Sequence, residues 1–382
     1  MRHASSIDGS CDARFAPLRE VFAESFANGS ELGASVAVTV DGQSVVDLWS
    51  GHADAARSRP WQRDTLVNLY STTKGMTALC AHLLVDRGEL DLDAPVARYW
   101  PAFAQAGKDA IPVRQLLCHR AGLAAIRRDV PIAELYDWSA MTSALAAETP
   151  WWEPGTAHGY HALTFGHLVG EVVRRVSGKS LGAFFRDEIA GPLGADLQIG
   201  LAASEDARVA ELLAPQAAEM VHATSAFAGN PLIARALGNP PADPSFTATR
   251  AWRGAEIPAA NGHGNARSVA RVYAALACGG TLDGITLCRP ETLARASSVE
   301  ASGPDLVLQF PVHWGLGYLV NADLGIYGPN PRSYGHTGYG GSFGFADPDA
   351  RVSVGYAMNR MAATLTGEPR GAALVAAVYA SL

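Results

Sequence analysis

Apolar positions near the amino terminus first follow a helical period and then alternate. They recur every three or four positions over residues 15–26, which predicts an amphipathic helix. Residues 34–40 and 44–49 instead alternate between apolar and polar side chains, and Asp41-Gly42 between them is typical of a tight hairpin turn. We therefore expect a helix followed by an antiparallel hairpin.

Helical spacing dominates the middle of the chain. A buried helix is expected to begin near Ser71, since apolar residues recur with helical spacing over residues 76–86 and Gly88 follows as a stop. Residues 163–176 and 181–189 show the same period. This part of the chain is expected to be mainly helical.

Residues 213–262 interrupt these patterns. The stretch is rich in proline, with glycine, asparagine and aromatic residues between the prolines, and long irregular stretches of this kind usually serve a function. We interpret it as a loop over a site. Its large apolar side chains either cover a substrate pocket or pack the loop itself: Met220, Phe227, Phe246 and Trp252.

Strand patterns return toward the carboxyl end. Residues 314–320, 342–347 and 352–358 alternate, and a helical pattern over residues 371–382 follows them. Strands therefore lie in both outer parts of the chain and helices lie between them. This order predicts an α+β fold, with an antiparallel sheet flanked by helices and an inserted, mainly helical domain.

The length of 382 residues fits two domains. We expect residues 1–75 and 262–382 to form the domain with the antiparallel sheet. Residues 76–261 would form the helical domain, including the loop at 213–262.

Composition and charge exclude several classes of function. Thirty Lys and Arg residues against 37 Asp and Glu residues give a net charge of −7, and the absence of a basic run argues against nucleic acid as a partner. No apolar stretch reaches about 18 residues and the amino terminus lacks a secretory-type apolar run, which favours a cytoplasmic protein without membrane contact. The five cysteines form no C-x-x-C pair, so we expect neither disulfides nor a zinc site.

Lysine is scarce in this chain, and one lysine lies three residues after a serine at the start of the expected buried helix. Ser71 and Lys74 form an S-x-x-K motif, and residues three apart share one face of a helix. The Lys74 amine can then reach the Ser71 hydroxyl as a base, because burial and the helix amino terminus both lower the pKa of a lysine. The same helix start would present the Ser71 N–H to a developing oxyanion.

Two further segments carry polar groups in glycine-rich surroundings. Residues 151–162 lead through aromatic and glycine residues to Tyr160, which is either a core tyrosine or a phenol that moves protons beside a lysine. Residues 334–345 place His336 and Thr337 among glycines that allow a backbone to approach a ligand, or form a simple bend.

Two other patterns are interpreted as structural. Residues 340–344 match G-x-S-x-G, but no histidine follows Ser342 to complete a triad of the α/β-hydrolase order. His158, His161 and His167 lack a convergent set of acidic residues for a zinc ion, and no metal site is expected.

The three motifs, in this order, resemble the serine β-lactamase and penicillin-binding protein superfamily. The resemblance is strongest to the family VIII carboxylesterases, which share the class C β-lactamase fold. Residues 91–96, 116–123 and 314–318 are also similar to segments of that family. The resemblance covers about residues 15–380 and is weakest over 213–262, and it implies a β-lactamase-like fold of the class C type.

The resemblance also implies roles for individual residues. Ser71 matches the acylated serine, Lys74 its partner, and Tyr160 the tyrosine of the Y-x-N motif, and either Lys74 or Tyr160 could be the base. The N–H groups of Ser71 and Tyr339 match the two oxyanion donors.

Two departures from the family pattern concern the substrate. His336 stands where β-lactamases have the lysine of K-T-G, and Ala162 stands where they have asparagine. A largely neutral imidazole anchors an anionic substrate poorly, so both changes favour neutral esters over β-lactams. The residues expected to contact the substrate are His161, Trp252, His336, Thr337 and Gly338.

We therefore expect a serine carboxylesterase that hydrolyses short-acyl esters through an acyl-enzyme and requires no cofactor. The partner is a small-molecule ester, and the sequence does not indicate an oligomeric state. Such an esterase could also hydrolyse β-lactams weakly. The alternatives are a class C-like β-lactamase, a D-amino-acid peptidase, or an acyltransferase. Outside the enzymes, the chain could be a binding or sensor module that is acylated once.

Overall fold

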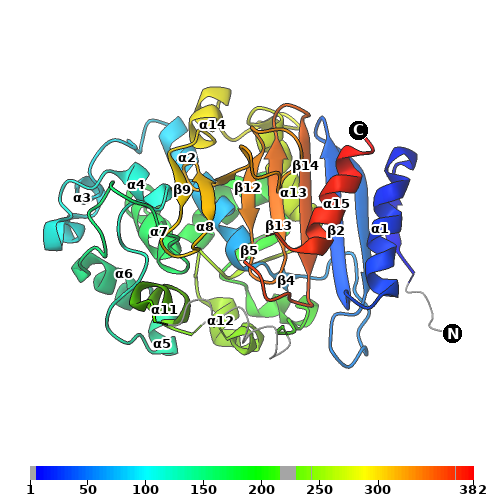
Figure 1. Ribbon diagram of the computed structural model, residues 1–382, viewed down its shortest axis with the longest axis horizontal. Helices are drawn as coiled ribbons and strands as arrows, with labels where there is room; N and C mark the ends of the chain where they lie inside the picture. The colour runs from blue at the N-terminus through cyan, green and yellow to red at the C-terminus, as the bar shows by residue number, and fades with distance from the viewer. Residues whose placement is uncertain (1–5, 216–228, 242, 366) are drawn as a thin grey trace.

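A nine-stranded antiparallel sheet forms the centre of the molecule (Figure 1). The computed structural model describes residues 6–215, 229–241, 243–365 and 367–382. The strand order is β1-β3-β2-β14-β13-β12-β11-β10-β9. The strands are β1 (Asp8–Cys11), β2 (Gly33–Val40), β3 (Gln43–Gly51), β9 (Ala301–Pro304), β10 (Pro311–Trp314), β11 (Leu319–Val320), β12 (Tyr334–Thr337), β13 (Phe343–Asp347) and β14 (Val352–Met358).

The sheet joins the two outer parts of the chain. The expected hairpin is confirmed as β2 and β3, and Asp41 and Gly42 between them both adopt positive φ angles, as a tight hairpin turn requires. Strand β2 then pairs with β14, so that Val38 lies opposite Val354. The middle of the sheet is therefore built from residues near opposite ends of the sequence.

Helices cover both faces of the sheet. Helix α13 (Ala266–Ala277) packs on β2, β13 and β14, and helices α1 (Ala16–Ala27) and α15 (Pro369–Tyr379) pack together on the other face (Figure 1). Successive residues of β13 serve the two faces: Phe343 lies against α15 at Gly371, while Gly344 lies against Val269 of α13. The expected helices at both ends of the chain are confirmed.

Two glycines let α13 lie close to the sheet. Gly344 and Gly355 are cross-strand partners. A Cβ atom at Gly355 would lie 2.2 Å from the carbonyl oxygen of Ala266, and one at Gly344 would lie 2.3 Å from the Val269 side chain. Any larger residue at these positions would push the helix away.

The middle of the chain is mainly helical, as expected. Its helices are α2 (Thr73–Asp86), α3 (Val96–Tyr99), α4 (Val113–Leu117), α5 (Ile132–Leu135), α6 (Trp138–Ala147), α7 (Thr164–Ser177), α8 (Leu181–Phe185) and α9 (Gly191–Leu193). The segment expected at 163–176 is α7, and α8 continues as a π-helical turn over Arg186–Ala190. The buried helix α2 begins two residues after Ser71, which lies in a short 3₁₀ turn instead.

The described part of the stretch 213–262 contains helices that the proline content concealed. Helix α11 (Pro231–Gly238) begins after Asn230, whose side chain accepts hydrogen bonds from the first N–H groups, and α12 (Arg250–Gly254) follows. Met220 and Phe227 lie outside the described residues. The division of the chain into two domains stays a prediction.

The remaining elements are short. Strands β4 (Val67–Asn68), β5 (Leu197–Ile199) and β6 (Gly262–Gly264) form a three-stranded sheet, and β7 (Thr281–Leu282) pairs with β8 (Ile285–Thr286) before α14 (Pro290–Ala296).

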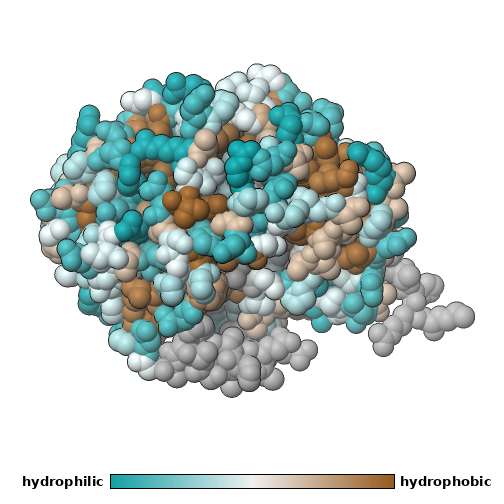
Figure 2. Space-filling model, turned by 45° about the horizontal axis from the view of Figure 1, so that its top comes forward, coloured by the Kyte–Doolittle hydropathy of each residue, from teal (hydrophilic) through white to brown (hydrophobic). Residues whose placement is uncertain are grey.

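Polar and intermediate residues cover most of the face shown in Figure 2, with apolar residues in separate patches. Among the described residues, no helix combines the length and the apolar character needed to cross a membrane, and the cytoplasmic location stays a prediction.

Candidate active site

Ser71 lies on a sharp turn between a strand and a helix. The 3₁₀ turn Tyr70–Thr72 connects the small three-stranded sheet to α2, and Tyr70 adopts a φ of 42°. A positive φ is costly for a bulky residue and persists only where the surrounding structure fixes it. Tyr70 is held by edge-to-face contacts with Trp252 and Tyr339. The Ser71 side chain is therefore held on a rigid, strained turn.

Lys74 is completely buried and reaches the serine from the first turn of α2. Its Nζ atom lies 2.9 Å from Ser71 Oγ, 2.7 Å from the carbonyl oxygen of Ala162 and 3.0 Å from that of Ala259. No carboxylate forms an ion pair with this amine in the described part of the chain, and burial lowers the pKa of Lys74 well below its ordinary value.

The three partners of Lys74 differ in what they can do. A carbonyl oxygen only accepts hydrogen bonds, so the two carbonyls take two N–H groups of the amine. Since a neutral amine has only two N–H groups, its lone pair then faces the Ser71 hydroxyl. The geometry thus suits a neutral Lys74 that accepts the serine proton.

Tyr160 lies against the same pair. The Lys74 amine is 4.6 Å from the centre of the Tyr160 ring, and the Tyr160 hydroxyl hydrogen-bonds with Ser71. Burial raises the pKa of Tyr160, the hydrogen bond with Ser71 opposes this shift, and the negative charge of Asp305 adds to it. The net effect is a phenol that keeps its proton at neutral pH.

Asp305 holds Tyr160 in place from behind. This carboxylate is 1% exposed and accepts hydrogen bonds from the Tyr160 N–H at 2.9 Å and from the Trp314 indole at 3.1 Å. The Trp314 ring in turn stacks on Tyr160 with 5.6 Å between ring centres and 5° between planes. The other partners are His158 and the N–H groups of Val307 and Leu308.

Burial alone would raise the pKa of Asp305, but these hydrogen bonds outweigh it and the pKa is lowered. Asp305 is therefore ionised, and it fixes both the tyrosine and the ring that supports it. The sequence analysis missed this residue because nothing in its local pattern distinguishes it from other aspartates.

The glycine-rich third motif brings its backbone against the serine turn. A Cβ atom at Gly338 would lie 2.3 Å from the carbonyl oxygen of Leu69, so only glycine allows this approach. Gly340 and Gly341 have φ angles of 92° and 126°, which closes the turn between β12 and β13. Tyr339 on this turn and Ser71 line one small cavity of about 20 Å³.

The walls of this small cavity are mostly apolar. They come from the segment between β9 and β11, from β12 and from the segment that precedes α15. The lining residues are Ser71, Tyr160, Leu308, Phe310, Val312, Trp314, Leu319, His336, Thr337, Tyr339 and Leu365. The structure thus gathers the three predicted motifs at one cavity, and the apolar wall is the part that sequence analysis missed.

His336 and Thr337 lie on β12 beside the cavity. The Thr337 hydroxyl donates to the carbonyl oxygen of Leu365 at 3.0 Å. His336 is 3% exposed, and burial together with the nearby Lys74 lowers its pKa to about 3. The imidazole is therefore neutral and does not attract an anion.

Gly338, His161 and Trp252, also expected to contact the substrate, do not line this cavity, and Gly338 borders the larger cavity described below. His161 is fully buried and its two ring nitrogens lie at hydrogen-bond distance from the Leu123 N–H and the Gly159 carbonyl. The Trp252 indole donates to the side chain of Asn68. Both side chains pack behind the site, and no described residue of the stretch 213–262 borders the cavity.

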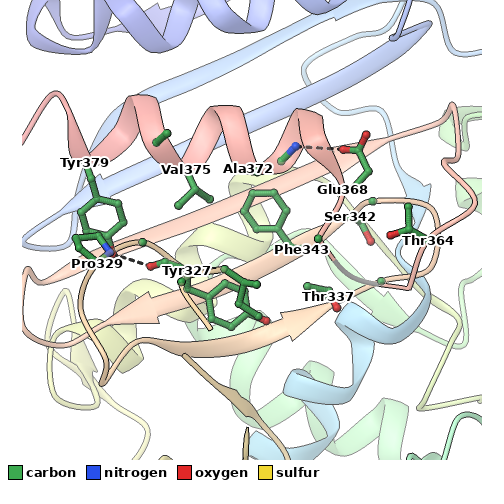
Figure 3. Close-up of a pocket in the computed structure, with 18 residues that line it drawn as sticks. Tyr327, Pro329, Thr337, Ser342, Phe343, Thr364, Glu368, Ala372, Val375 and Tyr379 are labelled. Carbon is green, nitrogen blue, oxygen red and sulfur yellow. Dashed lines mark hydrogen bonds between the residues drawn. The ribbon is translucent and has the colours of Figure 1, made fainter. Parts of the chain in front are cut away.

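A larger cavity of about 300 Å³ lies beside α15 (Figure 3). None of the three candidate catalytic side chains borders it. Ser342 of the G-x-S-x-G pattern does, but its hydroxyl donates to the Leu69 carbonyl at 2.8 Å and pairs with Thr72. Because a strand follows Ser342 in place of a helix, this serine lacks the setting of a nucleophile elbow.

Comparisons with known proteins agree with this geometry. A family model described as beta-lactamase matches residues 18–378. The chain belongs to the beta-lactamase family. The resemblance to family VIII carboxylesterases and the fold expected from the motifs are both confirmed within this family.

Two solved structures are similar to this chain over their whole length. A family VIII carboxylesterase is 48% identical, with a TM-score of 0.93, covering 99% of this chain and 100% of its own. A penicillin-binding protein homologue from Caulobacter crescentus is 44% identical, with a TM-score of 0.92 and the same coverage.

Curated relatives extend the comparison. The esterase/beta-lactamase LipL of Mycobacterium tuberculosis is 38% identical over 94% of this chain and 84% of its own. The esterase EstB of Burkholderia gladioli is 29% identical over 96% of this chain and 95% of its own.

Across the described ranges of this chain, His, Cys, Asp and Glu side chains form no group that could hold a metal ion.

Proposed function

We propose that this chain is a serine carboxylesterase that hydrolyses short-acyl esters through an acyl-enzyme on Ser71. The observation that carries the proposal is the buried Lys74 amine, 2.9 Å from Ser71 Oγ and bound to two backbone carbonyls. The names of two similar proteins, a family VIII carboxylesterase and the esterase EstB, support the substrate class.

Acylation begins with proton transfer from Ser71 to Lys74. As the proton leaves, Ser71 Oγ forms a bond to the acyl carbon and the ester carbonyl becomes an oxyanion. The N–H groups of Ser71 and Tyr339 would stabilise that oxyanion, which is supported by the position of both residues at one cavity.

Tyr160 then serves the leaving alcohol. Its raised pKa keeps the phenol protonated, so it can donate its proton to the departing oxygen, and the Lys74 ammonium, 4.6 Å from the centre of the Tyr160 ring, then returns a proton to the phenol. The C–O bond of the ester breaks and the alcohol leaves with one proton. In this scheme Lys74 is the base that deprotonates Ser71, and Tyr160 is the acid that protonates the leaving alcohol.

Deacylation repeats the sequence with water. Water attacks the acyl carbon, its proton passes through the Tyr160 and Lys74 pair, and Ser71 Oγ recovers a proton as the acid is released. No group beyond these side chains and water takes part in this scheme.

The size of the cavity and its uncharged walls favour small, neutral substrates. The cavity beside Ser71 is about 20 Å³, against about 300 Å³ for the cavity beside α15. His336 is neutral, and Ala162 brings no side-chain amide toward the site. A β-lactam carboxylate would find no cation at His336, although the name of the relative LipL makes weak β-lactam hydrolysis the second candidate.

The test compares hydrolysis of p-nitrophenyl butyrate and of a chromogenic cephalosporin. We expect rapid ester hydrolysis by the wild type, slow cephalosporin hydrolysis, and loss of both activities in Ser71→Ala. Ser342→Ala is the matched control, because Ser342 is a buried serine of the competing motif, and it should keep most of its ester hydrolysis. Full activity of Ser71→Ala would overturn the assignment, and faster cephalosporin turnover would make the protein a β-lactamase.

A further inference from the structure

The hydrogen bonds of His336 define its tautomer. Its Nδ1 atom lies 2.7 Å from the carbonyl oxygen of Thr337. Since a carbonyl oxygen only accepts, Nδ1 carries the hydrogen. A neutral imidazole has one N–H, so Nε2 must be the unprotonated nitrogen with its lone pair available.

This lone pair has no partner. His336 Nε2 is buried, and no hydrogen-bond donor of the described residues reaches it. Among the described residues that line the small cavity, it is the one buried side-chain nitrogen or oxygen without a hydrogen bond. A buried acceptor without a donor destabilises the site, and a bound donor removes that cost.

The aromatic side chains around His336 do not supply a donor for Nε2. The rings of Tyr160 and Trp314 lie against the imidazole, each 6.1 Å away between ring centres, and neither directs a polar group at Nε2. The Trp314 indole donates to Asp305, and the Tyr160 hydroxyl is paired with Ser71. The described residues therefore supply no donor, which leaves Nε2 open to a molecule bound in the cavity.

We propose that His336 Nε2 accepts a hydrogen bond from a hydroxyl group of the substrate, so that the preferred substrates are uncharged esters with a hydroxyl in the acyl or alcohol part. The inference rests on the proposed esterase function and names its substrate class. A carboxylate offers no donor at neutral pH, and an ammonium group would be desolvated among apolar walls. A hydroxyl supplies the missing donor without charge.

Two pairs of esters separate the two places where the hydroxyl can sit. p-Nitrophenyl 3-hydroxybutyrate against p-nitrophenyl butyrate tests the acyl part, and 2-hydroxyethyl butyrate against propyl butyrate tests the alcohol part. The wild type should prefer the hydroxylated member of at least one pair by about tenfold in kcat/KM, as one hydrogen bond of about 1.4 kcal/mol gives.

The variants show whether Nε2 is responsible for that preference. His336→Leu should lose it, and His336→Gln, which keeps an acceptor oxygen, should keep most of it. Each enzyme is judged by the ratio of kcat/KM within a pair, so a general loss of activity does not affect the result. His313→Leu is the matched control, since His313 lies outside the cavity with both ring nitrogens bonded to Ser302 and Asp323.

Equal kcat/KM values within both pairs for the wild type would overturn the inference, as would a preference that persists unchanged in His336→Leu. Circular dichroism and thermal unfolding show that each variant is folded. Turnover of the plain esters by Ser71→Ala would overturn the esterase proposal itself. Turnover that depends on Ser71 without any hydroxyl preference would overturn only the role of His336.

Discussion

The protein contains two fully buried lysines in similar settings, and they differ in one partner. Lys74 and Lys108 both lie over an aromatic ring, Tyr160 at 4.6 Å and Phe103 at 5.4 Å. Lys108 donates to three backbone carbonyls, whereas Lys74 has two carbonyls and the hydroxyl of Ser71.

This difference determines whether each site favours a protonated or a neutral lysine. Three carbonyls are satisfied only by an ammonium with three N–H groups, so Lys108 keeps its proton although burial lowers its pKa. Lys108 thereby joins the end of α6 to the segment before α4. At Lys74 a neutral amine satisfies both carbonyls and still accepts a proton. The hydroxyl in place of one carbonyl is what would let Lys74 act as the proposed base, whereas Lys108 is structural.

The largest effect should come from removing each amine in turn. Lys74→Met should lower kcat/KM for p-nitrophenyl butyrate by about 10³-fold, because the acceptor for the serine proton is gone. Lys108→Met should leave kcat/KM within about twofold but reduce the free energy of unfolding by about 1–3 kcal/mol, because three buried carbonyls lose their donor. Urea unfolding and steady-state kinetics measure the two effects. A similar loss of kcat/KM in both variants would contradict the assignment of a catalytic role to Lys74 and a structural role to Lys108.

A smaller effect is expected from Asp305, which supports the aromatic side of the Lys74 site. Asp305→Asn keeps one acceptor oxygen and turns its amide NH₂ toward either the Tyr160 N–H or the Trp314 indole N–H, so one of these two groups loses its acceptor and kcat should fall about tenfold. Loss of the negative charge also lowers the pKa of Tyr160, so the alkaline limb of the pH profile should move to lower pH.

Asp323→Asn is the control for this change. Asp323 is an exposed carboxylate that also pairs with a histidine, His313, but it lies away from the cavity. It should leave both kcat and the alkaline limb unchanged. An Asp305→Asn enzyme with a lower kcat but an unmoved alkaline limb would mean that Asp305 is important for packing alone.

The smallest effect concerns pH. The pKa of Lys74 lies below its ordinary value of 10.5 in the folded protein, so the unfolded chain binds more protons between those two values. The free energy of unfolding contributed by Lys74 should therefore rise with pH in that window and be lost as pH falls through the lowered pKa. Urea unfolding of the wild type at pH 7, 8 and 9 should show a steeper rise than Lys74→Met.

The kinetics should follow the same titration. As pH falls through the lowered pKa, Lys74 gains a proton and kcat/KM decreases. His336, with a pKa of about 3, does not contribute to this limb above about pH 5. A wild type and Lys74→Met whose stabilities change in parallel with pH would contradict a lowered pKa at Lys74.

The main elements of the fold, including β13 of the third motif, followed from periodicity, while strand β12 of that motif did not. The hairpin of β2 and β3 was predictable because alternation and an Asp-Gly turn coincide there. Strand β12 was not, since Gly335 and His336 carry no alternating pattern and the strand forms by pairing with its neighbours. Helix α11 was concealed by a proline that occupies its first turn without harm.

The site could be predicted where its residues are close in sequence. Ser71 and Lys74 are one helical turn apart, so their contact follows from spacing. Asp305 and the apolar wall at Leu308 and Phe310 meet Tyr160 only through the tertiary fold. Trp252 was expected at the substrate because it is large and lies in an irregular stretch, but its indole is bound to Asn68 in the core.

Because β2 pairs with β14, the central sheet can be completed only after almost the whole chain has been synthesised. During synthesis β2 and β3 emerge early, but the partner of Val38 is Val354. One edge of β2 therefore stays unpaired until nearly the whole chain has been synthesised. Contacts between such distant residues fold slowly, and an unpaired apolar edge is prone to aggregation. A ribosome stalled before residue 352 would therefore hold a chain that already contains Ser71 and Lys74 but whose central sheet is still open.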